Sequence, residues 1–280
     1  MFLQLWHQGA VNYGGDAETN PDFVALSPSG LSHPGESFGR TATEAELDSI
    51  KHAFVRGARD AAEIGADGVE LHAAHGFLLD QFLWPGTNLR KDRYGGPAIT
   101  ERATFVAEVA RAVREATGPD FVISVRISQW KESDYDAKIV EKPDELADLL
   151  TVLRAAGADI FHVSARRFWK PEWDGSDLSL AGWAKSFTDA AVIAVGSIGL
   201  DKDVMASLNS EEAEQTGARR IDELMRRFNR GDFDLVAVGR SQIGDPEWVA
   251  KMSGNRLSDI RAFRSGDPWL SHDVVDDVPA

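Results

Sequence analysis

The chain has 280 residues, a length that suits one large α/β domain or two small ones. Hydrophobic residues make up 43% of it, enough for a substantial core, and no run approaches the roughly 18 apolar residues of a membrane span. Cysteine is absent, which excludes disulfides, thiolate zinc sites and cysteine nucleophiles, and the net charge of −15 argues against nucleic acid or an anionic membrane as a partner.

The start of the chain, MFLQLWHQG, has no basic region followed by a long apolar stretch, so we read no secretory signal and take the cytoplasm as the default location. Short apolar runs predict strands at residues 2–6, 67–71, 121–127, 159–163, 191–195 and 234–238. Helical periodicity, capping and stop signals predict helices at residues 43–64, 100–117, 143–156, 180–189, 201–228 with a break near Gly217, and 246–260.

Two helix boundaries carry specific signals. Thr43 and Glu46 have capping-box spacing, which predicts a helix whose inner face carries Ile50, Phe54, Ala58 and Ala61. The pair Gly118-Pro119 stops the helix 100–117, whose apolar face is formed by Phe105, Val109 and Val113. Residues 7–39 are rich in Gly, Pro, Ser and Asn, which predicts a long loop.

A strand and a helix alternate six times, which predicts an α/β fold of the (β/α)8 TIM-barrel type, incomplete, with about six βα units. Three segments, EIGADGVELH, AAGADIFHVS and NRGDFDLVAVG, share the order helix end, Gly, Asp, strand, as repeats do. A doubly wound sheet gives the same alternation, but no strand runs directly into G-x-G-x-x-G and a helix. We expect one domain over residues 1–264 and a loose acidic tail over residues 265–280.

The stretch 67–96 organises the functional prediction. His72 and His75 follow the strand 67–71, and in a parallel barrel the loops after the strands form the catalytic face. Two histidines there can donate hydrogen bonds to one oxygen or bind a metal. A zinc site would need a third ligand, for which the candidates are Glu70, Asp80 and His162.

Glycines follow the last two predicted strands. Residues 196–199 read Gly-Ser-Ile-Gly, and Gly239-Arg240 follows the final strand. Glycine lets the backbone approach a ligand closely, and arginine binds phosphate through two N–H groups. Glycines also serve tight turns alone, but both loops at neighbouring strand ends, with an arginine, favour a phosphorylated ligand.

Arg126 lies inside the otherwise apolar strand VISVRIS, where a buried guanidinium needs a partner. That partner is either Glu70, in a structural ion pair, or the electron-rich end of a ligand. Gln4 and Trp6 are two residues apart on a strand and therefore share one face. A glutamine and a tryptophan at a barrel mouth suit a planar heteroaromatic ligand, although Trp6 also suits ordinary barrel filling.

Taken together, these segments resemble a known family. The stretch GVELHAAHGFLLDQFLWPGTNLRKDRYGG is similar to the signature of the old yellow enzyme family, the FMN-dependent NADH:flavin oxidoreductases and ene-reductases. QLWHQGA, ISVRISQW and LVAVGRSQIGDPEW resemble other landmarks of that family, in the same order. The resemblance covers almost the whole chain up to the acidic tail.

The resemblance implies an FMN site. Gln4 would contact the pyrimidine edge of the flavin, and Arg126 would lie near N1 and the C2 carbonyl and stabilise negative charge on the reduced ring. Four residues would hold the phosphate: Gly196, Ser197, Gly239 and Arg240. NADH or NADPH would reduce the flavin, and no metal would take part.

The resemblance also implies a small-molecule substrate. His72 and His75 would hydrogen-bond the carbonyl or nitro oxygen of an activated alkene and prepare its β-carbon for hydride. The pocket walls would include Trp6, Phe168 and Trp169. The family's usual proton donor is a tyrosine at the position of Phe77, and a phenyl ring has no proton to give. Protonation of the α-carbon would then fall to water or another group.

Family members carry about two more βα units before the strand that opens this chain. Two missing strands would leave two unpaired sheet edges, which invite pairing with another chain. We therefore expect this chain alone to bind FMN weakly or not at all. The alternatives are an inactive or partner-dependent truncated remnant of the family and a metal-dependent barrel lyase or hydrolase. The residues do not specify an oligomeric state.

Overall fold

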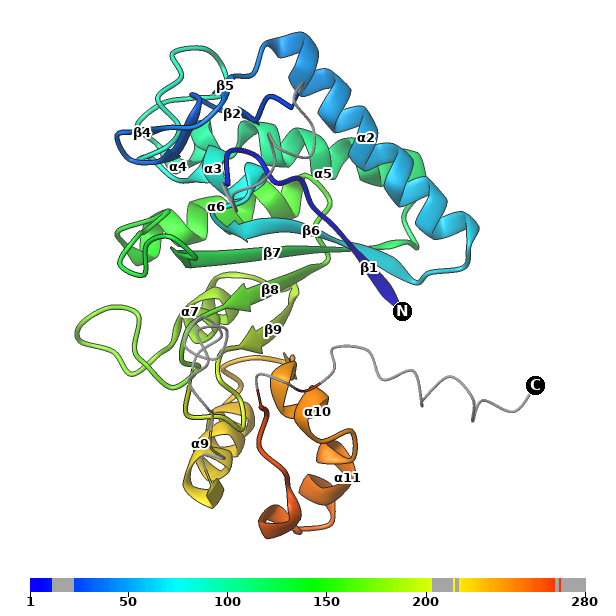
Figure 1. The fold of residues 1–280 in the computed structure, drawn as a ribbon, viewed down its shortest axis with the longest axis vertical. Helices are drawn as coiled ribbons and strands as arrows, with labels where there is room; N and C mark the ends of the chain where they lie inside the picture. The colour runs from blue at the N-terminus through cyan, green and yellow to red at the C-terminus, as the bar shows by residue number, and fades with distance from the viewer. Residues whose placement is uncertain (12–22, 203–213, 215–216, 265–266, 268–280) are drawn as a thin grey trace.

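A computed structural model describes residues 1–11, 23–202, 214, 217–264 and 267. Six parallel strands form its main sheet, in chain order (Figure 1). They are β1 (Phe2–Leu5), β6 (Gly68–His75), β7 (Val122–Lys131), β8 (Ile160–Ser164), β9 (Ala191–Val195) and β10 (Leu235–Val236). The order does not reverse, as it would in a doubly wound sheet. Of the predicted tail, only Asp267 is among the described residues.

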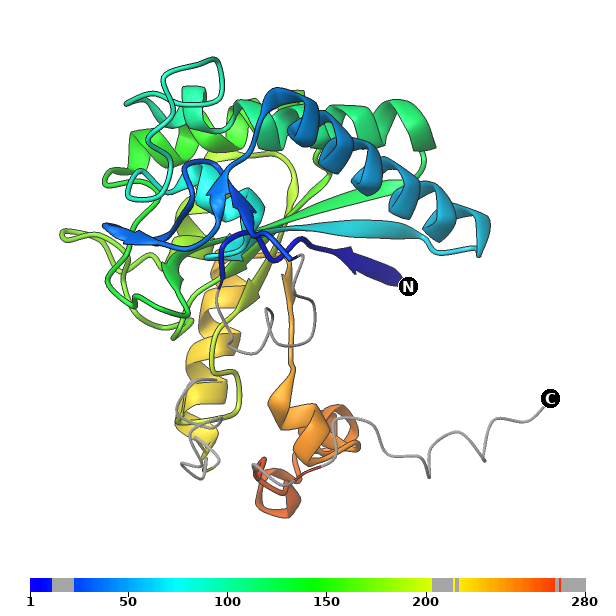
Figure 2. The same cartoon turned by 45° about the horizontal axis from the view of Figure 1, so that its top comes forward.

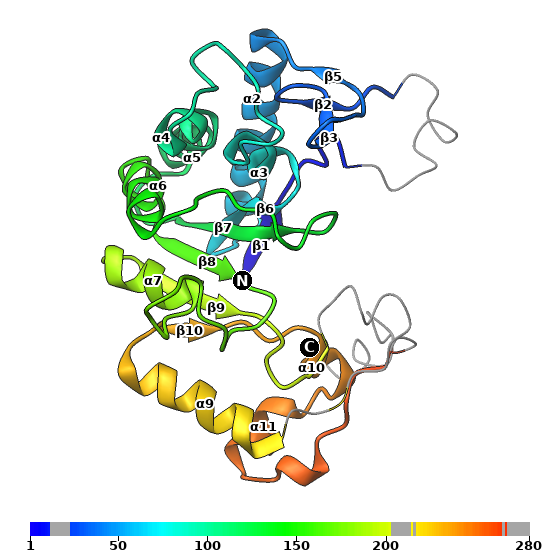
Figure 3. The ribbon, with the colours of Figure 1, turned by 90° about the vertical axis from the view of Figure 1, so that its left-hand side faces the viewer.

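Helices cover one face of this sheet. They are α2 (Glu44–Glu63), α5 (Thr104–Thr117), α6 (Pro143–Ala155), α7 (Leu180–Phe187) and α9 (Gly217–Arg230). Figure 3 shows them in an arc along one side of the strands. The helices α2 and α5 pack against each other, and α2 also contacts β6 (Figure 2). The predicted helix 201–228 falls in part on residues 203–213 and 215–216, which lie outside the described part of the chain.

The core lies between the sheet and these helices. The predicted capping box of Thr43 and Glu46 is confirmed, and the predicted inner faces of α2 and α5 are buried. The facing strand residues are at most 1% exposed: Val69, Leu71, Ile123, Val125, Ile127, Phe161 and Val163. Alternate residues of β6, β7 and β8 therefore face the core, and the residues between them face the other side of the sheet.

The segments next to the site differ from the prediction. The strand 67–71 continues to His75, and the strand 121–127 continues to Lys131. A short helix, α3 (Leu78–Leu83), occupies a stretch predicted as loop. All six of its residues are buried. The sequence did not predict this helix, because six residues are too few to establish a helical period and turn signals follow directly after them.

Three other predictions were wrong in detail. The predicted helix 100–117 is divided into α4 (Ile99–Arg102) and α5. The predicted loop 7–39 contains three short strands, β2 (Leu26–Ser27), β3 (Leu31–His33) and β4 (Glu36–Ser37). Strands β3 and β4 pair with each other, and β2 pairs with β5 (Arg40–Thr41), which directly follows the predicted loop. The predicted helix 246–260 is replaced by α11 (Trp248–Ser253) and a 3-10 turn, Leu257–Asp259, and a further short helix, α10 (Arg240–Gly244), precedes it.

The two outer strands of the main sheet are β1 and β10. Phe2 of β1 is 38% exposed, and Leu235 of β10 is 52% exposed. Apolar side chains at an exposed strand edge favour pairing with further strands. The sheet therefore has a well-covered centre and two open sides.

Candidate active site

A cavity of about 430 Å³ lies at the carboxyl ends of the strands. Its lining includes nine of the residues singled out by sequence: Gln4, His72, His75, Phe77, Arg126, Gly196, Ser197, Gly239 and Arg240. The volume is within the range of small-molecule and cofactor sites. Residues from five strands and from the loops after them thus meet in one place, as the barrel prediction requires.

His72 and His75 lie side by side at the end of β6. Their ring centroids are 5.2 Å apart, and the His75 ring lies 4.4 Å from the Trp130 ring. Nε2 of His75 is 2.8 Å from the hydroxyl oxygen of Ser164 on β8. Nδ1 of His72 is buried and has no hydrogen-bond partner in the structure. One histidine is therefore held by its neighbours, and the other has a buried nitrogen left for a ligand.

Both imidazoles are neutral near pH 7. Burial, with the nearby charge of Arg126, lowers the pKa of His72 to about 3. Burial also lowers the pKa of His75 well below its ordinary value, and the charge of Arg126 adds to that shift. A neutral imidazole donates one hydrogen bond and accepts one. The pair can therefore offer two N–H groups to a single substrate oxygen.

Arg126 is in register with His72 on β6 and with His162 on β8. Its NH1 nitrogen lies 4.0 Å from a Glu70 carboxylate oxygen, and its Nε is buried with no hydrogen-bond partner. Burial lowers the pKa of Arg126, but the ordinary pKa of an arginine is so high that the side chain stays charged. The sequence left two roles open for Arg126, an ion pair with Glu70 and a cation that faces the ligand. The structure is compatible with both.

Glu70 is the centre of a hydrogen-bond network below the cavity. It accepts from Gln4 Nε2 at 2.8 Å and from the Ser124 hydroxyl at 3.0 Å, and His162 Nδ1 lies 2.8 Å away. Burial alone would raise the pKa of Glu70, but these partners, chiefly His162, lower it to about 2. The carboxylate is ionised at all physiological pH values and anchors Gln4 and Arg126 electrostatically.

The two glycine loops form the opposite wall. Gly196 has φ 158°, and a Cβ there would lie 2.4 Å from the carbonyl oxygen of Ala165, so only glycine fits. The Ser197 hydroxyl donates toward the carbonyls of Arg166 and Lys202, and Arg240 donates to the Lys202 carbonyl at 2.8 Å. No atom lies within 4 Å of a Cβ built on Gly239, so that side of the loop is open.

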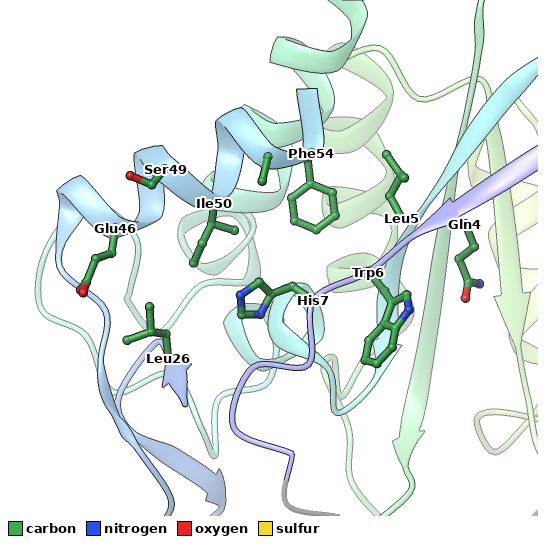
Figure 4. A pocket seen from close by; sticks show the side chains of 10 residues that line it. Gln4, Leu5, Trp6, His7, Leu26, Glu46, Ser49, Ile50 and Phe54 are labelled. Atoms are coloured by element: carbon green, nitrogen blue, oxygen red, sulfur yellow. The ribbon is translucent and has the colours of Figure 1, made fainter. Parts of the chain in front are cut away.

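Phe77 separates the histidines from Trp6. Its ring centroid lies 5.1 Å from the His72 ring and 5.0 Å from the Trp6 ring. Trp6 lines a second cavity, between β1 and α2, rather than the main one. Figure 4 shows Leu5 directed toward Phe54 of α2, whereas Gln4 and Trp6 point away from that helix.

Phe168 and Trp169, predicted as pocket walls, do not line the main cavity. Phe168 is 2% exposed and packs in the core, and its N–H donates to the Gly196 carbonyl at 3.1 Å. Trp169 lies under the guanidinium of Arg220, 4.0 Å from the ring centroid. Their role against a substrate stays a prediction.

Sequence reasoning missed several lining residues, among them Trp130, Glu132, Tyr135, Ser164 and Arg166. Ser164 could have been found, since it lies two residues beyond His162 on one strand and so faces the same way. Trp130 and Tyr135 could not, because the predicted strand ended at residue 127 and gave their side chains no direction.

The described residues contain no group of three or more His, Cys, Asp or Glu side chains that could hold a metal ion. No helix in the described ranges is long and apolar enough to cross a membrane.

Comparison with solved structures supports the fold. Morphinone reductase is 26% identical, with a TM-score of 0.68, and the match covers 95% of this chain and 67% of that one. The old yellow enzyme homologue from Zymomonas mobilis has a TM-score of 0.71 at 19% identity, over 100% of this chain and 73% of that one. The latter likeness shows the fold alone. These neighbours are TIM barrels, and the sheet described above is α/β and parallel, as in that class.

Curated relatives agree. The NADH oxidase of Thermoanaerobacter brockii is 34% identical over 93% of this chain, which spans 37% of the length of that protein. The 12-oxophytodienoate reductase 7 of Oryza sativa subsp. japonica is 37% identical over 97% of this chain, which spans 70% of it. The sequence profile of one family matches residues 1–259. The members of this family use FMN and NADH or NADPH. The chain therefore belongs to the NADH:flavin oxidoreductase / NADH oxidase family.

Proposed function

We propose that this chain is an FMN-dependent oxidoreductase that uses NADH or NADPH to reduce an activated alkene, an α,β-unsaturated carbonyl or nitro compound. The observation that carries the proposal is the paired neutral imidazoles of His72 and His75, on the cavity that also holds the two glycine loops. The histidines suit a substrate oxygen and the loops suit a phosphate, so one cavity accommodates substrate and cofactor together.

The residues present fit FMN. The buried Arg126 Nε without a partner is a cationic donor for the electron-rich edge of a flavin. Gln4, held by Glu70, supplies an amide for the same edge. The open backbone at Gly239 and the glycine-only position at Gly196 form a cradle for a phosphate, with Arg240 beside it. When bound, FMN supplies the hydride that reduces the substrate and regains one from the nicotinamide.

The side chains of the chain itself position and polarise the substrate. N–H groups of His72 and His75 bind the carbonyl or nitro oxygen and stabilise the negative charge that develops there. Ser164 and Trp130 hold the His75 ring in place. Phe77 carries no proton, so water protonates the α-carbon. The slow step is then this protonation rather than hydride transfer to the flavin.

We further propose that the six strands form an arc of an eight-stranded barrel, with β1 and β10 facing the gap. Gln4, the flavin-edge residue on β1, is exposed, as are Leu235 and Val236 of β10. An FMN site with one open side binds its ligand weakly, because water competes for the exposed hydrogen bonds. The same exposed edges favour a second candidate, a partner-dependent remnant in which another polypeptide completes the sheet.

The test is product analysis with labelled reductant. The chain, saturated with FMN, receives an enone and NADH or NADPH deuterated at the transferred C4 position. We expect deuterium at the β-carbon of the saturated product and a solvent hydrogen at the α-carbon. Turnover that does not depend on FMN would contradict the proposed chemistry. Turnover that requires an added protein fraction would favour the partner-dependent candidate.

A further inference from the structure

A buried ion pair lies directly behind the site. Lys131, the last residue of β7, donates from Nζ to an Asp80 carboxylate oxygen of α3 at 2.8 Å, and both side chains are 0% exposed. Removing two charges completely from water has a large cost, and well-packed apolar side chains in their place are often as stable or more stable. Stability alone is therefore a weak reason for this pair, and its position suggests another.

Asp80 holds the turn between β6 and α3. His75 and Gly76 both have positive φ, 65° and 94°, which is costly for a residue other than glycine. The second Asp80 oxygen accepts the Gly76 N–H at 2.6 Å, and Gln81 Nε2 donates to the Gly76 carbonyl at 2.8 Å. Phe77, at the N-cap of α3, provides no side-chain cap. Side chains of the first helical turn therefore fix both polar groups of Gly76.

Lys131 connects this turn to the strand that supports His75. Its Nζ also lies 3.4 Å from the Ser128 carbonyl, and the Ser128 hydroxyl accepts the His75 N–H at 2.9 Å. The backbone N–H of Glu132 donates to the His75 carbonyl at 3.3 Å. The backbone of His75 is thus held from β7 on one side, and its neighbour Gly76 is held by Asp80 on the other.

We propose that Asp80 and Lys131 are positioning residues, whose ion pair holds the His75–Gly76 turn in its strained conformation and so aims the His75 imidazole at the substrate. The positioning of the turn follows from the hydrogen bonds of Asp80, Lys131 and Ser128. The effect on catalysis rests on the proposed function. A displacement of about 1 Å in such a group lowers a rate by about 10²-fold.

The first experiment reads the position of His75 without any flavin. Ring nitrogens of 15N-histidine-labelled chain are observed by NMR, with His75 assigned from a His75→Asn variant. In the double variant Asp80→Leu with Lys131→Met, the Gly76 N–H loses its acceptor and no charge is left buried. We expect the His75 ring signals to move or broaden while the fold is kept.

A second change shows whether the contact with Ser164 is lost. Ser164→Ala shifts the His75 signals of the wild-type chain, because it removes the hydroxyl 2.8 Å from Nε2. In the Asp80→Leu, Lys131→Met background we expect Ser164→Ala to shift them little, since the contact has already been lost. Equal shifts in both backgrounds would show that the ion pair does not position His75 and would overturn the proposal.

The control removes an ion pair at the other end of the sheet. Arg114 of α5 pairs with Asp159, which directly precedes β8. Arg114→Met with Asp159→Asn should lower the melting temperature and leave the His75 signals in place. If the control disturbs His75 as strongly, the effect is general loosening and the positioning role is wrong. If the double variant at Asp80 does not fold, Asp80→Asn alone, which keeps the shape of the side chain, should give a smaller shift; no shift there also overturns the proposal.

Activity then separates this inference from the proposed function. With FMN bound, Asp80→Leu with Lys131→Met should lower kcat/KM for the alkene by about 10- to 100-fold and leave the FMN dissociation constant within about twofold. A chain that never binds FMN would contradict the proposed function and leave the NMR result for His75 intact. Unchanged kcat/KM with displaced His75 signals would contradict the catalytic part of the inference.

Discussion

The centre of the sheet and its two edges are built differently. On β6, β7 and β8 the core-facing residues are buried, and the polar groups on the other face contact one another: Glu70 with Ser124 and His162, and His75 with Ser128 and Ser164. On β1 the side chains of Leu3 and Leu5 pack against the core, whereas Phe2 and Gln4 are exposed, as are both residues of β10. Gln4 is the main polar residue that reaches the cavity from the β1 side.

This difference divides the proposed site into two halves. The substrate half, His72 and His75, is preorganised by the packed centre, so little reorganisation is needed when an oxygen binds. The cofactor half depends on Arg126 from the centre but also on Gln4, Gly239 and Arg240 near the edges. We expect changes in the centre to have large effects and equivalent changes at the edges to have small ones.

The largest effect should come from a tyrosine at position 77, which should accelerate reduction of the alkene. Phe77→Tyr places an O–H beside His72, and general acid catalysis typically contributes about 10²–10⁴-fold. We expect reoxidation of the flavin by the alkene to accelerate within that range and reduction by NAD(P)H to change by less than about twofold. Stopped-flow measurement of the two half-reactions checks this. Equal acceleration of both would show that Phe77 does not limit proton transfer.

Truncation of one apolar side chain in the centre and one at the edge should lower the free energy of unfolding by different amounts. Phe161 of β8 is 0% exposed, and Phe161→Ala should lower the free energy of unfolding by about 3–5 kcal/mol. Leu235 of β10 is 52% exposed, and Leu235→Ala should change it by no more than about 0.5 kcal/mol. Urea unfolding at pH 7 measures both. Similar losses would mean that the edges are as well packed as the centre.

The Glu70 network should make stability depend on pH at the acidic end. Because its partners lower the folded-state pKa of Glu70 from 4.5 to about 2, its ionised form stabilises the fold above about pH 4.5, and this contribution is lost as the pH falls toward 2. We expect Glu70→Gln to lower the free energy of unfolding at pH 7 by on the order of 3 kcal/mol and to have little effect near pH 2. Urea unfolding across that range checks the trend. A pH-independent difference would contradict it.

Of the two residues at the proposed flavin edge, Arg126 in the centre should contribute more to FMN affinity than Gln4 at the edge of the sheet. Loss of a charge-assisted hydrogen bond in Arg126→Met should weaken FMN binding by roughly 10- to 100-fold. Gln4 is exposed, so the loss of its neutral hydrogen bond to the flavin in Gln4→Ala should weaken FMN binding by roughly 2- to 10-fold. Flavin titrations give both dissociation constants. A larger effect of Gln4→Ala would reverse the comparison.

The centre was also the part that the sequence predicted well. Apolar runs predicted the central strands β6, β7 and β8, although β6 and β7 continue further than predicted. The spacing of Thr43 and Glu46 predicted the start of α2. His72, Arg126 and the glycine loops could be placed together because the carboxyl ends of parallel strands share one edge. These signals are local or periodic, so a single sequence is sufficient to detect them.

What the sequence did not show depends on contacts between distant segments. The pairing of Lys131 with Asp80 is invisible from the sequence, because a lysine after a strand is usually solvated. The continuation of β7 past residue 127 follows from its pairing with β6 up to His75, and it places Trp130 on the His75 ring. Trp6, Phe168 and Trp169 were assigned to the pocket from the family resemblance, and Trp6 also from the strand face that it shares with Gln4, whereas their positions depend on how the loops turn.

The most direct test of the proposed flavin site is an FMN titration of the chain, followed by visible absorbance and then by addition of NADH or NADPH. We expect a saturable change in the flavin spectrum that requires FMN in excess, because the β1 side of the site is open, and we expect the reductant to bleach that spectrum. No saturable change at any FMN concentration would contradict the assignment of the cavity as a flavin site. FMN retained stoichiometrically through purification would contradict the open edge as its weak point.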